Sequence, residues 1–538
     1  MARAYPIALT LTVLCTGPIA AQAMSGLYTL DSTGSGSRNF KSFIEATYNL
    51  SRSGVNGAVT IEVASGAYPG TDRWTTTPVP GASATNRVTF RSKTKHGATI
   101  PYTMTPTLGG YALPVKYITF DGFRFQGSAQ YSNNAGLRLY NNVAQIEIRN
   151  CHFDGAYLWI QDCVNVEVHH CLFAYLFSTT TARGRHIDIQ NCDYLVLHHN
   201  EFRMAECRTA IKMYHYVSKR TRTKIYNNLF WGAPRGSEPI LDFNGVQETQ
   251  IDHNTFVIFA TNGWGAEVLE INGRLGVWND IRNNIFYSEG KYALLSITPH
   301  LPYIHFFNRN IYWIPNGYLV RYPRTNQSPI TYGSLTPWQI GTKQDPVGIQ
   351  ADPGFRNIKT TPYDLRPRAG SVAGGRAINT QVWITDDFEG TVRFKPTTIG
   401  AYESFADFDL FGKGCAGTAN KIPVLGYSGS LKHGSTTFAL ELSNAAPKSN
   451  RSFLAVGASN STWGPVPLPY ALGGGCSLLV SLDIVLPTLM IFGKSTLRLG
   501  IPGATNLRGT KVHFQWGVVD PAAGGIGLAM TSGATLTL

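Results

Sequence analysis

The sequence predicts an all-β protein in which a parallel β-solenoid is followed by a small antiparallel β-sandwich. Two observations predict it: an eight-residue phrase that recurs between residues 118 and 312, and a change to short strands with Gly and Pro turns after residue 403. The phrase alternates apolar and polar residues, as a half-buried strand does. Its closing aromatic residues lie 20 to 30 residues apart. A repeat of this length indicates a solenoid, whose coils stack because one coil cannot bury its own core.

Two positions of the phrase keep the same kind of side chain from one repeat to the next. The sixth position holds Cys151, Cys171, Asn200, Asn228, Asn254, Asn284 and Asn310. The eighth position holds Phe153, Phe173, Phe202, Phe230, Phe256, Phe286 and Tyr312. Stacked amides can hydrogen-bond along such a column, and stacked rings fill the interior. We therefore interpret both columns as structural ladders.

The segments on either side of the repeats carry a family resemblance. Phe40, Phe43, Ile44 and Tyr48 have the spacing of an amphipathic helix that would cover the open end of the solenoid. Further phrases open and close the coils: Gly57–Gly70, Ala351–Phe355 (ADPGF), Tyr363–Pro367 (YDLRP) and Ile399–Glu403 (IGAYE). Over roughly residues 24–403 the chain resembles the pectin-lyase-like superfamily. The resemblance implies a right-handed parallel β-helix, but no single reaction, because this superfamily hosts several activities.

The two ends of the chain differ from the repeats. Residues 1–23 are typical of a secretory signal, with Arg3, an apolar run at Ile7–Leu14 and a small-residue cleavage site at Ala21–Ala23. We therefore expect an exported, extracellular or surface protein, without a membrane span, and a monomer. Residues 404–538 are predicted to form the β-sandwich, from strand-like runs separated by turns. It resembles modules appended to many secreted bacterial proteins.

The cysteines support export and suggest one disulfide. Cys415 and Cys476 stand alone in the second domain, and we expect them to form a bridge. Within the repeats, Cys151 with Cys171 and Cys163 with Cys192 share ladder positions about 4.8 Å apart, which is within disulfide range. Side chains stacked in parallel point the same way, so free buried thiols are favoured over bridges there. No cysteine spacing resembles a zinc site.

The formal net charge of +13 bounds the class of partner. A basic exported protein meets nucleic acid, anionic membrane or acidic polysaccharide. The chain carries no helix-turn-helix, zinc-finger or RNA-binding sheet signature, so we expect no nucleic-acid partner. An acidic polysaccharide is favoured, and a charge that only aids solubility is the alternative.

A second strand of each repeat places polar side chains in line on one outer face. Its second position holds Arg138, Trp159, Asp188, Lys212, Asp242, Glu270 and Ser296. Its fourth position holds Tyr140, Gln161, Gln190, Tyr214, Asn244, Asn272 and Thr298. Aromatic faces can stack on sugar rings, amides and phenols can bind hydroxyls, and charged groups can transfer protons. Cross-rung ion pairs without any function would give the same line of charges.

Three functions fit this line. In a lyase, Lys212 would take the proton next to a uronate carboxylate, with Asp242 and Glu270 as ligands of a possible Ca²⁺ and Arg274 nearby. The resemblance implies such chemistry, since lyases of this fold often use a Lys or Arg base. The motif strings of any one lyase family are nevertheless missing. We also expect Asp188 and Asp242 to hold the Lys212 ammonium from the two adjacent rungs.

The second function is glycoside hydrolysis by two carboxylates. Asp188 and Asp242 would lie about 9.6 Å apart, near the upper limit for an inverting enzyme, and Asp242 and Glu270 about 4.8 Å, closer to a retaining one. The polygalacturonase-like motifs are absent, except for an echo at Ile211 and Lys212. The third function is glycan binding without cleavage, as in an adhesin.

The first strand of each repeat offers a runner-up site. Its outer face and turn carry the adjacent pairs His169–His170 and His198–His199. Neighbouring side chains of a strand point to opposite sides, so we expect neither pair to chelate a metal as a unit unless the turn bends. A histidine base stays the alternative to Lys212. We also expect long loops near Ser178–Arg185, Trp231–Glu238 and Ala260–Ala266 beside the candidate groove.

Overall fold

The structure is a computed structural model of the 538-residue chain. It describes residues 22–72, 74–109, 114–127, 135–174, 184–205, 207–216, 221–234, 236, 238–260, 267–272, 278–298, 305–324, 326–369, 371–391, 393, 397–403, 407–446, 450–521, 523 and 525–538. The predicted secretory signal and most of the expected long loops lie outside these ranges, so they stay predictions.

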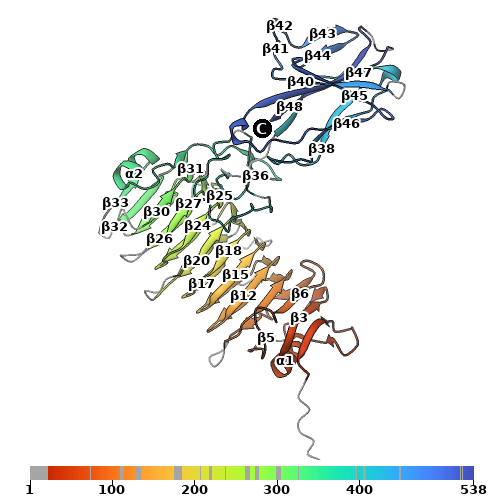
Figure 1. The fold of residues 1–538 in the computed structure, drawn as a ribbon. Helices are drawn as coiled ribbons and strands as arrows, with labels where there is room; N and C mark the ends of the chain where they lie inside the picture. The colour runs from red at the N-terminus through yellow and green to blue at the C-terminus, as the bar shows by residue number, and fades with distance from the viewer. Residues whose placement is uncertain are drawn as a thin grey trace, which may run out of the picture.

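The first part of the chain is a right-handed parallel β-helix, as predicted, whose coils each contribute a strand to three long sheets (Figure 1). Sheet A contains, in spatial order, β2 (Asn39–Phe40), β1 (Met24–Leu30), β3 (Val55–Val63), β6 (Val88–Ser92), β9 (Ile118–Asp121), β12 (Ala144–Arg149), β15 (Val164–His169), β18 (Val196–His198), β21 (Lys224–Tyr226), β24 (Gln250–Asp252), β27 (Asp280–Arg282) and β30 (Phe306–Asn308). The repeating phrase supplies sheet A, and its end turns into sheet B.

The other two sheets complete each coil. Sheet B contains β34 (Ile349–Gln350), β31 (Ile311–Trp313), β28 (Ile285–Ser288), β25 (Thr255–Ile258), β22 (Leu229–Gly232), β19 (Glu201–Arg203), β16 (Leu172–Ala174), β13 (His152–Asp154), β10 (Arg124–Gln126), β7 (Ala98–Pro101) and β4 (Gly66–Ala67). Sheet C contains β33 (Gln327–Tyr332), β32 (Val320–Arg324), β29 (Leu295–Thr298), β26 (Leu269–Asn272), β23 (Leu241–Asn244), β20 (Cys207–Tyr214), β17 (Gly184–Gln190), β14 (Tyr157–Gln161), β11 (Ala135–Tyr140), β8 (Thr107–Leu108) and β5 (Thr75–Thr76). Each sheet buries its inner face, so the core lies along the axis of the helix.

Both predicted ladders are present. The rings of Phe153, Phe173 and Phe202 stack with successive centroids 4.7 Å apart. In the turn between sheets A and B, the side-chain amide of Asn254 donates to that of Asn284 at 3.0 Å and accepts from the backbone N–H of Asn228. Because these amides are fully buried, the ladder satisfies turn backbone that water cannot reach.

A helix covers the N-terminal end of the solenoid, but its inward face differs from the prediction. Helix α1 (Phe43–Ser53) begins after Ser42, whose hydroxyl caps the N–H of Glu45. Phe43 and Leu50 are buried, whereas Ile44 and Tyr48, which we expected to face the core, are 49% and 57% exposed. The expectation was wrong because the helix starts three residues later and its buried face also includes Ala46 and Thr47.

The solenoid closes with β35 (Phe355–Asn357), β36 (Asp364–Pro367) and a segment that packs along the corner between sheets A and B. Helix α2 (Leu335–Thr342) precedes this closure. In the closing segment, the buried Arg393 guanidinium donates to the carbonyl of Gly400 and to the side chain of Asn227. Desolvation lowers the pKa of Arg393, and the neighbouring Glu403 and Asp387 carboxylates oppose this effect.

The second part of the chain forms antiparallel sheets beyond the end of the solenoid (Figure 1). One sheet contains β37 (Asp407–Phe411), β48 (Leu528–Thr537), β47 (Lys511–Val519), β40 (Arg451–Gly457) and β45 (Ile484–Leu489). The other contains β38 (Val424–Ser428), β39 (Ala439–Ser443) and β46 (Ser495–Arg498), and two hairpins follow: β41 (Thr462–Trp463) with β42 (Val466–Pro467), and β43 (Tyr470–Gly473) with β44 (Cys476–Leu478). The domain limits at residues 403 and 404 stay a prediction.

The state of the cysteines agrees with the sequence analysis. The Cys415–Cys476 disulfide is present, and Cys151, Cys163, Cys171, Cys192 and Cys207 are buried free thiols. None of the helices in the described ranges has both the length and the apolarity that crossing a lipid bilayer requires.

Candidate functional site

The outer face of sheet C carries the polar line that the sequence predicted. The strand register pairs Arg138 with Trp159, and it then continues in single steps through Asp188, Lys212, Asp242, Glu270 and Ser296. The flanking row runs beside it through Tyr140, Gln161, Gln190, Tyr214, Asn244, Asn272 and Thr298. The residues therefore lie in the predicted line, although Asp188 and Ser296 are buried, with 8% and 2% of their surface exposed.

An ion pair occupies the centre of this line. Lys212 Nζ lies 2.8 Å from Asp242 Oδ2, with the lysine side chain 36% and the carboxylate 17% exposed. Asp188, one rung away on the other side, bonds instead to Arg185 of its own strand at 2.6 Å. The expectation that both acids hold Lys212 is thus wrong for Asp188, because a guanidinium three residues earlier reaches its carboxylate.

An acidic pair lies further along the same face. Glu267, which precedes β26, is 9% exposed, and its desolvation together with the nearby Glu270 charge raises the pKa of its carboxyl. Arg321 approaches Glu267 at 3.4 Å and continues the line one rung beyond Ser296. Neither residue was predicted from the sequence. Glu267 lies outside the alternating strand, and the apolar Val320 before Arg321 was the signal that could have extended the register.

The predicted sugar-binding side chains lie along the same surface. The guanidinium of Arg138 lies 5.4 Å from the ring centroid of Trp159, and Tyr214 packs on Tyr216 at 4.2 Å. The amide of Asn272 donates to Glu270 at 2.6 Å. Gln190 faces Asp188 at 3.5 Å, Asn244 is exposed, and Arg274 lies outside the described residues.

The carboxylates of this face do not form a complete calcium site. Ca²⁺ takes six to eight oxygen ligands. Asp242 is already bound to an ammonium and Glu270 to an amide. Across the described ranges, no three Asp, Glu, His or Cys side chains surround one point as metal ligands do. Calcium binding stays a prediction.

The histidine pairs of sheet A form a different arrangement from the one expected. The Nδ1 atoms of His198 and His199 lie 2.6 Å apart, and those of His169 and His170 lie 2.8 Å apart. The expectation that neighbours point apart was wrong, because His170 and His199 adopt positive φ angles of 54° and 53° and leave the strand conformation.

The contacts of these histidines argue against the alternative of a histidine base. Glu167 contacts Nε2 of His198 at 3.0 Å, and Glu147 contacts Nε2 of His169 at 3.2 Å. Both ring nitrogens of each strand histidine are therefore engaged, which leaves neither nitrogen open to a substrate proton. Burial lowers the pKa of His199 to about 3, so this turn histidine is neutral.

Comparison with known proteins gives likeness of fold alone. No family model matches the chain, and no curated protein matches it. A solved structure of a PL6 alginate lyase in complex with a trisaccharide is 15% identical, with a TM-score of 0.33, over 57% of this chain and 62% of that one. The chain thus spans less than two thirds of that lyase's length.

Two further structures illustrate the range of likeness. A mannuronic-acid-specific family 6 polysaccharide lyase from human gut microbiota is 14% identical, with a TM-score of 0.29, over 55% of this chain and 83% of that one. Tailspike protein 2 of the Escherichia coli O157:H7 bacteriophage CAB120 is 10% identical, with a TM-score of 0.20, over 89% of this chain and 67% of that one. The similar structures thus include polysaccharide lyases, but likeness this remote carries no argument about activity.

Proposed function

We propose that the protein is an exported polysaccharide lyase that acts on an acidic, uronate-containing glycan bound along sheet C. The observation that carries the proposal is the register of its outer face, which sets Trp159, Lys212, Asp242 and Arg321 in one line. This line offers an aromatic surface for a sugar ring, cations for uronate carboxylates and an amine for proton transfer. The net charge of +13 supports an acidic ligand.

The reaction assigned to this face is β-elimination. Lys212 takes the proton from the carbon next to the uronate carboxylate, and a carbon–carbon double bond forms as the bond from the ring to the leaving sugar oxygen breaks. The leaving oxygen takes a proton from solvent water and departs as a hydroxyl. Arg321 lies four rungs from Lys212, about 19 Å at the usual rung spacing, so it binds the carboxylate of another uronate along the same glycan. An ammonium held by Asp242 is a poor base, so the proposal requires the bound glycan to displace the 2.8 Å contact and free the amine.

Hydrolysis is the second candidate, and one observation favours it. Glu267 and Glu270 lie on the same face, and burial raises the pKa of Glu267. A carboxyl whose pKa is raised by burial, with a second carboxyl beside it, is the arrangement that glycosidases use as acid and base. In this mechanism Glu267 protonates the leaving oxygen, and Glu270 activates water or attacks the sugar.

A glycan screen tests the proposed function. Purified protein is incubated with uronate-containing and sulfated polysaccharides, with and without a calcium chelator, and both ultraviolet absorbance and reducing ends are followed. The lyase proposal predicts an absorbing unsaturated uronate together with new reducing ends. New reducing ends without that absorbance would indicate the hydrolase, and binding without either product would indicate an adhesin.

A further inference from the structure

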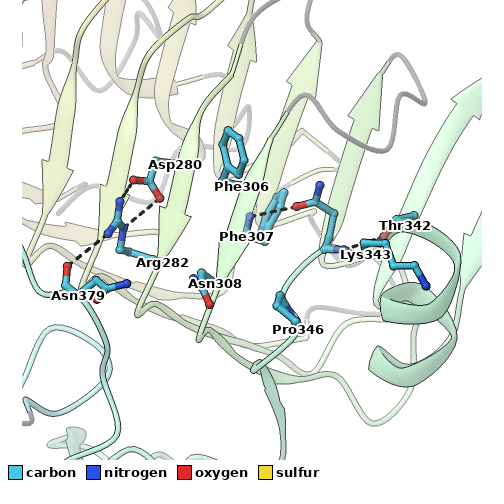
Figure 2. A pocket seen from close by; sticks show the side chains of 10 residues that line it. Asp280, Arg282, Phe306, Phe307, Asn308, Thr342, Lys343, Pro346 and Asn379 are labelled. Carbon is cyan, nitrogen blue, oxygen red and sulfur yellow. Dashed lines mark hydrogen bonds and ion pairs between the residues drawn. The ribbon is translucent and has the colours of Figure 1, made fainter.

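A pocket of about 590 Å³ lies on sheet A. It is on a different face of the β-helix from the Lys212 line, the row of polar side chains from Arg138 to Arg321 on sheet C. Its floor is formed by β27 and β30, whose register sets Asp280 beside Phe306 and Arg282 beside Asn308. The chain after α2, from Thr342 to Pro346, forms one side, and Asn379 of the closing segment forms the other (Figure 2). Nothing in the proposed elimination uses these residues.

One exposed aromatic ring lines this pocket, and a second lies beside that ring. Phe306 projects from the outer face of β30 and is 58% exposed. Trp278 precedes β27, is 43% exposed, and lies with its ring centroid 6.3 Å from that of Phe306 at an interplanar angle of 73°. Large apolar side chains that gather on an otherwise polar outer surface mark binding sites. Two rings at this angle can contact a pyranose ring on one face and along one edge.

The polar side of the pocket is held in place before any ligand arrives. Arg282 donates from Nε to Asp280 Oδ1 at 3.0 Å and from a terminal nitrogen to the carbonyl oxygen of Asn379 at 3.3 Å. The backbone N–H of Phe307 donates to the side chain of Gln344 at 3.1 Å, which fixes the opposite wall (Figure 2). Such fixed walls reduce the entropy that a ligand must lose on binding.

The pocket has a positive charge available to a ligand. Lys343, at the C-terminal cap of α2, is exposed and forms no ion pair within the described ranges. The Asp280 carboxylate is neutralised by Arg282, so the ammonium of Lys343 is the charge that a ligand meets.

We propose that this pocket is a second glycan-binding site, which holds one acidic pyranose with its ring against Phe306 and Trp278 and its carboxylate toward Lys343. It shares with the proposed function only the class of glycan, and none of its residues belongs to the Lys212 line. A site on another face of the same solenoid would hold a polysaccharide chain at a second point. Two tethered contacts on one polymer raise the effective concentration of the glycan at sheet C.

Binding of a uronate hexasaccharide, measured by calorimetry in the Lys212→Met background so that no cleavage occurs, tests this site. Phe306→Ala and Lys343→Met should each weaken the binding event assigned to the pocket about tenfold, as expected for loss of a stacking or charged contact. Tyr318→Ala and Lys359→Met, which change similarly exposed side chains outside the pocket, are the matched controls and should bind as the background does. With a carboxyl-reduced hexasaccharide, Lys343→Met should no longer weaken binding, whereas Phe306→Ala should still weaken it.

The outcomes separate this site from the proposed function. With Lys212 intact, Phe306→Ala should keep full activity on short uronate oligosaccharides, which cannot reach both faces. If the pocket variants bind the hexasaccharide like their controls, the second site is refuted, whatever Lys212→Met does to activity. If the pocket variants lose binding while no glycan is cleaved by the unmodified protein, the second site stands and the lyase proposal fails.

Discussion

Lys212 and Asp242 lie on adjacent rungs of sheet C, and their side chains meet at 2.8 Å between Nζ and Oδ2. The contact is partly exposed, so as an ion pair it contributes no more than about 1 kcal/mol to stability. Its effect on reactivity is larger, because it determines whether the amine is free to accept a proton. Variants that break this contact therefore distinguish a structural role of Lys212 from a catalytic one.

Asp242→Asn is predicted to keep lyase activity and to raise kcat/KM. Without the carboxylate, the glycan no longer has to displace the 2.8 Å contact between Asp242 Oδ2 and Lys212 Nζ before the amine can accept a proton. The measurement is kcat/KM of both proteins on the same glycan. A variant without activity would instead indicate that Asp242 itself takes part in the chemistry.

Asn254→Ala is predicted to destabilise the β-helix by about 3 kcal/mol, because it leaves buried donors and acceptors of the ladder without partners. Asn254 is fully buried and bonds to both neighbouring amides of the ladder. Asn200→Cys should cost less, since a thiol can take the acceptor role between rungs, as where the backbone N–H of Cys163 donates to Cys192 Sγ at 3.4 Å. Urea unfolding measures both, and equal losses would argue against a cooperative ladder.

His186 is predicted to make stability fall in mild acid. Burial lowers the pKa of His186 to about 4, whereas the unfolded chain titrates near 6.5. Below pH 6.5 His186 is protonated in the unfolded state but not in the native state. The free energy of unfolding therefore decreases as the pH falls from neutral toward 4. His186→Gln keeps an N–H for the Arg203 carbonyl and should remove up to about 3 kcal/mol of this dependence. Identical pH dependences in the two proteins would contradict this assignment.

Removal of the Cys415–Cys476 disulfide is predicted to destabilise the C-terminal sheets selectively. The bridge joins positions 61 residues apart, and closing a loop of that length stabilises a domain by about 4 kcal/mol. Cys415→Ser with Cys476→Ser should therefore lower the calorimetric transition of this part and leave that of the β-helix in place. Cys207→Ser, which changes a free buried thiol, is the control.

The ladders could be predicted because each rung repeats the same letters at the same positions of one phrase. Strand alternation then fixed which side chains face outward, and the line from Arg138 to Ser296 follows from that rule alone. The contacts within the line could not be predicted, because Arg185 reaches Asp188 from within one strand. The distance between rungs does not determine which of several cationic side chains a carboxylate binds.

The alternation of side chains along a strand does not predict the arrangement of the histidine pairs or of Glu267. His170 and His199 lie in turns with left-handed backbone, which rotates each ring toward its neighbour. Glu267 acquires its raised pKa from burial beside Glu270, a contact that no spacing rule contains. The pocket at Phe306 joins segments more than 30 residues apart in the sequence, so it required the closing segment and α2 to be placed in space.

Lys212→Met tests the central claim most directly, because it keeps the aliphatic stem and removes the amine. On the most reactive uronate glycan, formation of the unsaturated product should fall by at least about 10²-fold, the usual effect of losing a general base, with binding and the unfolding midpoint nearly unchanged. Retention of full activity would contradict the assignment and leave Lys212 as a cross-rung ion pair. Full activity of Lys212→Met together with an inactive Asp242→Asn would establish carboxylate chemistry on this face instead.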